Sequence, residues 1–138
     1  MRFLNKENET WVAFGVSAVA LSIALAAYGR HAMVDPILQM RWSIAIDYMR
    51  QMGFGLLILV LMRSVWLENQ RIPWPERFLV LGVLLFSGVL LLESIAPEWV
   101  EGNALRLAPP LGGMLLIISW LWFLIQFMRR KKAVEPRI

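Results

Sequence analysis

Three long stretches of this chain contain no charged residue, and this feature limits the possible folds more than any other. The stretches cover residues 10–29, 78–92 and 107–128. A helix needs roughly 20 residues to cross a hydrocarbon core about 30 Å thick. Backbone polar groups find no water in lipid, so a crossing segment of this kind is expected to be helical. The sequence therefore predicts a transmembrane helix at each stretch.

The composition shows that these stretches cannot all be packed inside a soluble core. Of the 138 residues, 59% are hydrophobic and only 17% are charged, whereas a soluble domain carries about 25% charged residues. A domain of this size buries only about two-thirds of its surface. Much of the apolar surface must therefore face lipid.

A fourth span is less obvious because its apolar part, residues 52–62, is too short to cross alone. Extending it back to Trp42 through Arg50 and Asp47 gives about the length that a crossing requires. Asp35 followed by Pro36 is a good helix start, since it combines a capping side chain with a proline at the first helical position. We therefore expect a long second helix from Pro36, whose first turns lie in or above the membrane interface.

The sequence thus predicts an all-α membrane protein, a bundle of four transmembrane helices with both termini cytoplasmic. The expected spans cover residues 11–29, 42–62, 78–96 and 111–128, between an N-terminal segment, 1–10, and a basic tail, 129–138. Short loops rich in Lys and Arg stay in the cytoplasm. Only four basic residues fall on the other side, namely Arg30, Arg41, Arg50 and Arg106. The remaining ones set the orientation: Arg2, Lys6, Arg63, Arg71, Arg77, Arg129, Arg130, Lys131, Lys132 and Arg137.

The first span has two further readings to weigh. Residues 24–26 (ALA) resemble a signal-peptidase site, but the apolar run before them is longer than the roughly 7–15 residues of a cleaved signal, so we expect an uncleaved span. The span is also rich in small residues, which allow close approach between helices in membranes. This predicts a helix packed in the interior of the bundle.

Three short motifs carry a resemblance to a known family. They are YGRHA at 28–32, a glycine at 82 followed by LFSG at 85–88, and PPLGG at 109–113. In this order they resemble the domain-of-unknown-function 423 family, the bacterial relatives of transmembrane protein 256, over about residues 11–124. The resemblance implies a four-helix inner-membrane protein of unknown activity, with a structural motif made of Gly29, Gly82, Ser87, Gly88, Pro109, Pro110, Gly112 and Gly113.

The chain departs from the family pattern at three places. Gln51 and Met52 stand where relatives carry a Tyr-His pair, residues 89–91 read VLL in place of Ser-Leu-Tyr, and Ser119 precedes Trp120 where a glycine is usual. A function that needs the second histidine or the third-span tyrosine is therefore not expected here.

Polar residues at membrane depth are the candidates for a functional site. Gln39, Ser43, Asp47 and either Arg50 or Gln51 recur at helical spacing and predict one polar stripe on the second helix. Ionisable groups within a span are costly and often mark function. We therefore predict a candidate functional polar cluster of Asp47, Arg50 and Glu93, with Arg30 and His31 at its outer rim. The alternative is that these side chains reach the headgroups and only end the helices.

Little other chemistry is available. The chain has no cysteine and a single histidine, so zinc–thiolate, iron–sulfur and disulfide sites are excluded. Monovalent copper could be held by the thioethers of Met33, Met40, Met49 and Met52 beside His31, but methionine is also an ordinary apolar filler. No catalytic residue, cofactor or metal is expected.

These features predict an integral protein of the bacterial inner membrane whose partners are membrane lipid and other membrane-protein subunits or itself. The basic tail follows a membrane exit, so anionic lipid is expected there and nucleic acid is not. We expect a non-catalytic accessory or assembly subunit that is not an enzyme. The alternative is a small oligomeric channel or carrier with its polar cluster in the outer leaflet.

Overall fold

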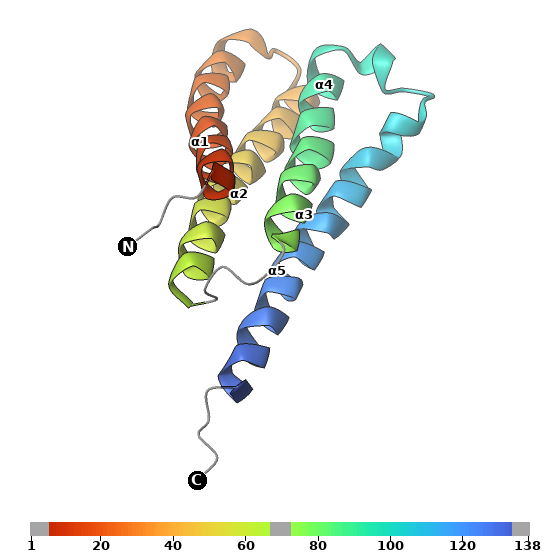
Figure 1. Ribbon diagram of the computed structural model, residues 1–138. Helices are drawn as coiled ribbons and strands as arrows, with labels where there is room; N and C mark the ends of the chain where they lie inside the picture. Colours follow the sequence, from red (N-terminus) through yellow and green to blue (C-terminus); the bar gives the residue numbers. More distant parts are fainter. Residues whose placement is uncertain (1–5, 67–72, 134–138) are drawn as a thin grey trace.

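The computed structural model describes residues 6–66 and 73–133, with side chains as far as Arg129. Four helical segments in it are long and apolar enough to cross a membrane, which confirms the all-α, four-helix fold. The third segment is one continuous rod built from α3, η1 and α4 (Figure 1). The elements are α1 (Lys6–Ala32), α2 (Pro36–Trp66), α3 (Trp74–Val83), the π-helical η1 (Leu84–Gly88), α4 (Val89–Ile95), the short 3-10 helices η2 (Pro97–Trp99) and η3 (Ala104–Leu107), and α5 (Ala108–Ala133).

The helices are longer than the predicted spans. Helix α2 begins at Pro36 as predicted, and the carboxylate of Asp35 accepts a hydrogen bond from the backbone N–H of Ile37 at 2.8 Å. It continues to Trp66, and α5 runs through the first part of the basic tail to Ala133. A span predicted from uncharged residues stops at the first charge, whereas Lys and Arg are good helix formers and prolong a helix into the interface. Arg2, Arg71 and Arg137 lie outside the described residues.

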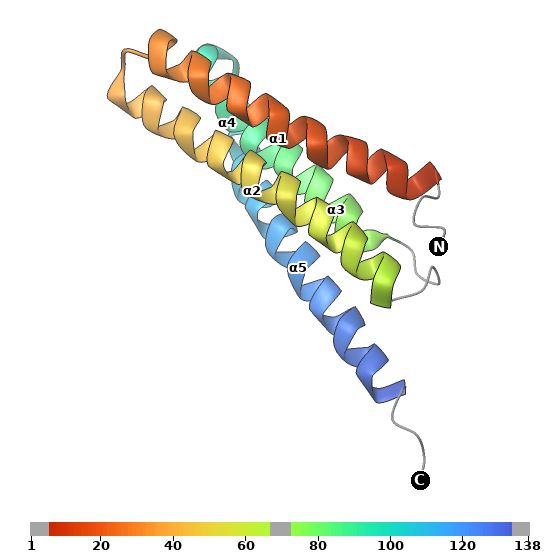
Figure 2. The ribbon, with the colours of Figure 1, turned by 90° about the vertical axis from the view of Figure 1, so that its left-hand side faces the viewer.

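Two helical hairpins lie side by side, and α2 joins them. Helix α1 packs along α2, α3 packs along α5, and α2 contacts the third segment over its length. Figure 2 shows α5 leaning away from the other helices. The start of α1 and the last turn of α5 lie at the same end of the molecule, as an even number of crossings requires.

The prediction that α1 is an interior helix is wrong. Only 17% of its most apolar window is buried, against 44% for α2. Its small residues form two stripes. One stripe faces α2, where an ideal Cβ on Gly15 would lie 3.0 Å from the carbonyl oxygen of Gly53. The other stripe is exposed on the far side, and consists of Ala13, Ser17, Ala20, Ala24 and Ala27.

The motif glycines of the third and fourth segments lie against each other. An ideal Cβ on Gly112 would lie 2.5 Å from the backbone nitrogen of Phe86 and 2.8 Å from the carbonyl oxygen of Gly82. This contact falls on η1, a π-helical stretch that widens the third segment and also contains the buried Ser87. Pro109 and Pro110 lie in the first turn of α5, where missing backbone donors cost nothing. Gly88 and Gly113 make no such close contact, so Gly82 and Gly112 are the pair that needs a glycine.

Candidate functional site

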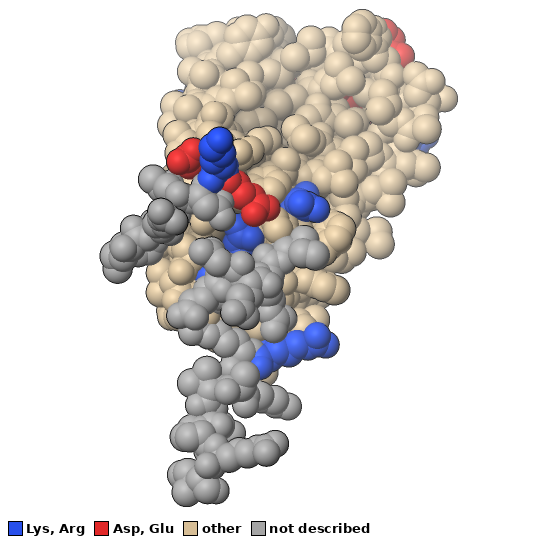
Figure 3. Space-filling model, viewed as in Figure 1, with Lys and Arg blue, Asp and Glu red and all other residues tan. Residues whose placement is uncertain are grey.

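Two ion pairs between helices lie near the two ends of α2, and we take them as the limits of the segment expected to lie in hydrocarbon. Arg41 on α2 bonds Glu93 on α4 at 2.7 Å, and Arg63 near the other end of α2 lies 3.0 Å from Glu76 on α3. Arg41 and Arg63 are about 33 Å apart along the helix at ~1.5 Å per residue. That length matches the roughly 30 Å hydrocarbon core of a bilayer. In the face shown in Figure 3, charged side chains gather towards the two ends and leave a broad uncharged band between them.

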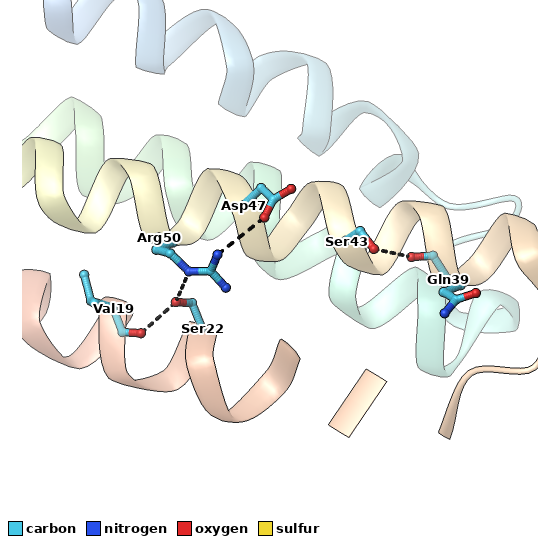
Figure 4. A network of polar contacts seen from close by, with 6 residues as sticks. All are labelled: Val19, Ser22, Gln39, Ser43, Asp47 and Arg50. Atoms are coloured by element: carbon cyan, nitrogen blue, oxygen red, sulfur yellow. Dashed lines mark hydrogen bonds and ion pairs between the residues drawn. The ribbon is translucent and has the colours of Figure 1, made fainter. Parts of the chain in front are cut away.

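Asp47 and Arg50 lie inside this band, and they form the one charged pair of α2 at that depth among the described residues. Asp47 is about 9 Å and Arg50 about 14 Å from Arg41 along the helix. The carboxylate of Asp47 lies 3.7 Å from Nη1 of Arg50, and its side chain is 60% exposed. Arg50 also donates from Nε to the hydroxyl of Ser22 on α1 at 3.3 Å (Figure 4). The guanidinium therefore turns towards α1, while the carboxylate stays on the outer surface.

The predicted polar stripe lines a shallow cavity of about 210 Å³ between α1 and α2. Gln39, Ser43, Asp47 and Arg50 belong to its lining, with Arg30 at the end of α1. The hydroxyl of Ser43 donates to the carbonyl of Gln39 within the helix at 2.9 Å, so it offers little to a neighbour in the monomer. His31 is exposed and does not line this cavity. The stripe is thus an open polar surface that runs from the end of the bundle towards the middle of the membrane.

Glu93 does not join Asp47 and Arg50, so the predicted single cluster has to be divided in two. Glu93 is 19% exposed and bonds Arg41, and the two line a separate cavity with Arg106. Arg41 and Arg50 are nine residues apart, which turns a helix by about two and a half turns and places them on opposite sides. One side faces α4 and the other faces α1.

A buried polar cluster at the end of the bundle that carries the termini was missed by the sequence reasoning. The sequence places Arg63 among the loop charges that set the orientation, yet it is buried and donates from Nη2 to Oδ1 of Asn8 at 2.8 Å. Glu76 is fully buried beside it. The signal was in the spacing: Arg63 continues the buried positions Leu56 and Leu59 by seven and four residues. Such spacing places it on the core face of α2.

The sequence reasoning also missed a hydrogen bond between two helices, α5 and α3. The buried hydroxyl of Ser119 donates to the backbone carbonyl of Pro75 at 2.7 Å. Ser119 occupies the place where relatives were expected to carry glycine, so the departure from the family pattern adds a hydrogen bond. The neighbouring Trp120 packs its ring against Gly55 of α2.

The first motif glycine has a clear packing role. The indole of Trp42 occupies the space that a side chain at position 29 would fill, and its Nε1 donates to the carbonyl of Leu25 at 2.9 Å. The ring also contacts Tyr28. Gly29 therefore lets the second helix dock closely on the end of the first.

Two of the methionines of the second helix lie in different surroundings. Met49 belongs to the core, whereas Met40 is 58% exposed on the outer side of α2. In the part of the chain that the structure describes, no three His, Asp or Glu side chains are grouped as metal ligands.

The chain is similar to uncharacterised bacterial membrane proteins. The model of a family described as "Protein of unknown function (DUF423)" matches residues 25–113. A UPF0382 membrane protein of Staphylococcus haemolyticus is 26% identical over 118 residues, covering 83% of this chain and 92% of the relative. The UPF0382 membrane protein YwdK of Bacillus subtilis is 24% identical over 121 residues, covering 85% and 94%. No solved structure matches the chain.

Proposed function

We propose, from the premise that this chain belongs to the DUF423 family of multi-pass membrane proteins in the bacterial plasma membrane, that it is a non-catalytic assembly subunit. In this proposal another membrane protein packs on the three exposed residues of the polar stripe of α2, which are Gln39, Ser43 and Asp47. The family description itself names no activity, so the role rests on the geometry of the stripe.

The exposure of Asp47 carries the proposal. A carboxylate at hydrocarbon depth costs roughly 2.5–3.5 kcal/mol on insertion scales unless it is paired or hydrated. Arg50 offsets only part of this cost, because 3.7 Å is too long for a charge-assisted hydrogen bond and the guanidinium also bonds Ser22. A polar surface on a neighbouring helix would supply the missing donors. Polar side chains join membrane helices in this way.

The exposed face of α1 supports assembly independently. The outer small-residue stripe, Ala13 to Ala27, is exposed, and α2 is the one described helix that packs along α1 extensively. Small residues at such spacing allow two helix backbones to approach closely. A chain that only had to bury α1 against α2 would need one such stripe.

The remainder of α2 favours an interface over a conducting pathway. Beyond Arg50 the outward side of the helix carries Phe54, Ile58 and Leu61, each about half exposed. The polar surface therefore stops near the middle of the membrane and does not continue to the other end. A channel or carrier, the alternative, would need polar groups from further chains to complete the path.

Extraction of the tagged chain from its own membranes in polymer nanodiscs, followed by native mass analysis, tests the proposal. We expect the wild type with a stoichiometric protein partner and Asp47→Leu without it. Glu98→Leu is the matched control, because Glu98 is an exposed carboxylate in the connection after α4, and we expect it to keep the partner. A wild-type chain surrounded by lipid alone would refute the assembly role, and ion flux through liposomes holding the pure chain would favour the channel.

A further inference from the structure

A second cavity lies at the end of the bundle away from the termini, where α2, α4 and the connection between α4 and α5 meet. Its volume is about 420 Å³. The lining holds two cationic and two anionic side chains. It consists of Arg41, Glu93, Val100, Glu101, Gly102 and Arg106.

The four charges are not all used within the protein. Arg41 and Glu93 neutralise each other through their 2.7 Å bond and are partly buried. Glu101 and Arg106 are exposed, and neither makes an ion pair with another described residue. The cavity therefore presents the carboxylate of Glu101 and the guanidinium of Arg106 beside a neutral ion pair.

The surroundings place this cavity at the level of lipid headgroups. Large apolar side chains that neighbour its lining residues in the chain are exposed, since Ile95, Trp99 and Leu107 are each 63% exposed. Trp at such a position is typical of the membrane interface. Arg41 lies about 8 Å along α2 from its first residue, close to the edge of the hydrocarbon band. A molecule that enters the cavity thus comes from the interface, with acyl chains free to follow the apolar rim.

We infer that this cavity binds the headgroup of a zwitterionic phospholipid with a primary ammonium group. The guanidinium of Arg106 matches the phosphate, because Arg presents several N–H donors to phosphate oxygens. The carboxylate of Glu101 matches the ammonium, which has three N–H donors for it. The inference depends on the chain spanning the membrane and is independent of the proposed assembly role.

Charge and hydrogen bonding separate this headgroup from the other common ones. A headgroup with a net negative charge would satisfy Arg106 but leave the carboxylate of Glu101 without a cation. A quaternary ammonium carries charge but no N–H donor, so it would lose the hydrogen bonds to Glu101. Each missing charge-assisted bond weakens binding, since bonds of this kind are about twice as strong as neutral ones.

Native mass spectrometry on delipidated full-length protein tests the inference with three phospholipids of identical acyl chains, carrying ethanolamine, glycerol or choline. We expect the ethanolamine lipid to be retained about fivefold or more over either of the others. Arg106→Gln should weaken all three lipids, and Glu101→Gln should remove the preference for ethanolamine over choline. The control Glu98→Gln lies in the same connection but does not line the cavity, and it should keep the preference.

Three results would overturn the inference. One is equal or stronger retention of the glycerol lipid, and another is retention that neither variant changes. The third concerns the source of the headgroup: soluble O-phosphoethanolamine, which has no acyl chains, should displace the lipid only weakly. Displacement at comparable concentrations would show that the cavity takes a free phosphate ester and not a lipid.

Discussion

Two ion pairs of α2 have the same chemistry and opposite surroundings. Arg63 and Glu76 lie 3.0 Å apart, buried among α1, α2 and α3, with Asn8 as a further partner. Asp47 and Arg50 lie 3.7 Å apart on one helix, and the carboxylate is mostly exposed. The first pair connects elements of the fold. The second leaves a charge on the outer surface at hydrocarbon depth, which a monomer has no use for.

In the proposed function, this difference separates residues that hold the bundle together from residues that bind a partner. Both pairs involve α2: Asp47 and Arg50 lie on this helix within the expected hydrocarbon band, whereas Arg63 lies at the edge of the band and pairs with Glu76 of α3. The distinction is whether the charged group finds its partners inside the chain. Three pairs of substitutions and one single substitution test it, from the largest expected effect on stability to the smallest.

Glu76→Ala should give the largest loss. Removal of one partner from a buried pair leaves the other charge buried without compensation, which costs about 3–5 kcal/mol, and the side chain of Arg63 is only 10% exposed. Denaturation of the purified protein in mixed micelles measures the free energy of unfolding. The double variant Arg63→Met with Glu76→Leu should recover much of the loss, because it removes both charges. If Glu76→Ala alone were as stable as the wild type, the contrast between the two ion pairs would be contradicted.

Gly112→Ala should come next and extends the comparison from charge to packing. The new Cβ would lie 2.5 Å from the backbone nitrogen of Phe86, so α5 has to shift away from η1. Overpacking of this kind costs about 1–3 kcal/mol. Gly88→Ala is the matched control in the same motif, since nothing lies within 4 Å of its Cβ, and it should be neutral or slightly stabilising. Equal losses for the two variants in thermal unfolding would contradict the close contact.

Ser119→Ala should cost about 1 kcal/mol, the usual net value of one hydrogen bond. The loss follows from the buried bond to the carbonyl of Pro75, which links α5 to α3. Ser43→Ala removes the same hydroxyl from the exposed polar stripe, where the bond runs within one helix. We expect no measurable change in the free energy of unfolding for Ser43→Ala. A loss of stability as large as that of Ser119→Ala would contradict the proposal that the stripe binds a partner.

Asp47→Leu should change the stability of the isolated chain least. The carboxylate of Asp47 faces lipid or detergent both in the folded monomer and in the separated helices, so the insertion cost cancels between the two states. Its effect should fall on assembly, read as the fraction of chain that carries a partner in nanodiscs. A loss of several kcal/mol in the monomer would show that Asp47 belongs to the fold, as Glu76 does.

Much of the fold could be predicted from the sequence, because every segment that crosses lipid has to be helical, about 20 residues long and almost free of charge. Uncharged runs located three spans, and Asp35 with Pro36 located the start of the second helix. The same rule does not locate the ends of the helices, because Lys6 and Arg63 are charged and yet belong to α1 and α2. The interior position predicted for α1 is also wrong, because small residues show that a helix can pack closely but do not show how many neighbouring helices it has.

The polar stripe could be predicted from helical spacing within one element, whereas the partners of each charge could not. The sequence groups Glu93 with Asp47 and Arg50 in one cluster, yet Glu93 bonds Arg41, because the pairing depends on how α2 is rotated towards α4. The sidedness of the termini stays a prediction. A functional site on the half of α2 that follows Pro36 also stays a prediction; the polar residues that the structure groups there exclude Glu93 and are open on one side.

Lipid exposure of position 43 tests the central account most directly, and the absence of native cysteines makes single-cysteine labelling possible. A nitroxide at Ser43→Cys would be compared with one at Ile117→Cys, which is 62% exposed on α5. In nanodiscs cut from the native membrane, we expect position 43 to collide with oxygen far less than position 117. After purification to the monomer, the two should become similar. Equal collision rates already in the native membrane would contradict a covered stripe and with it the assembly role.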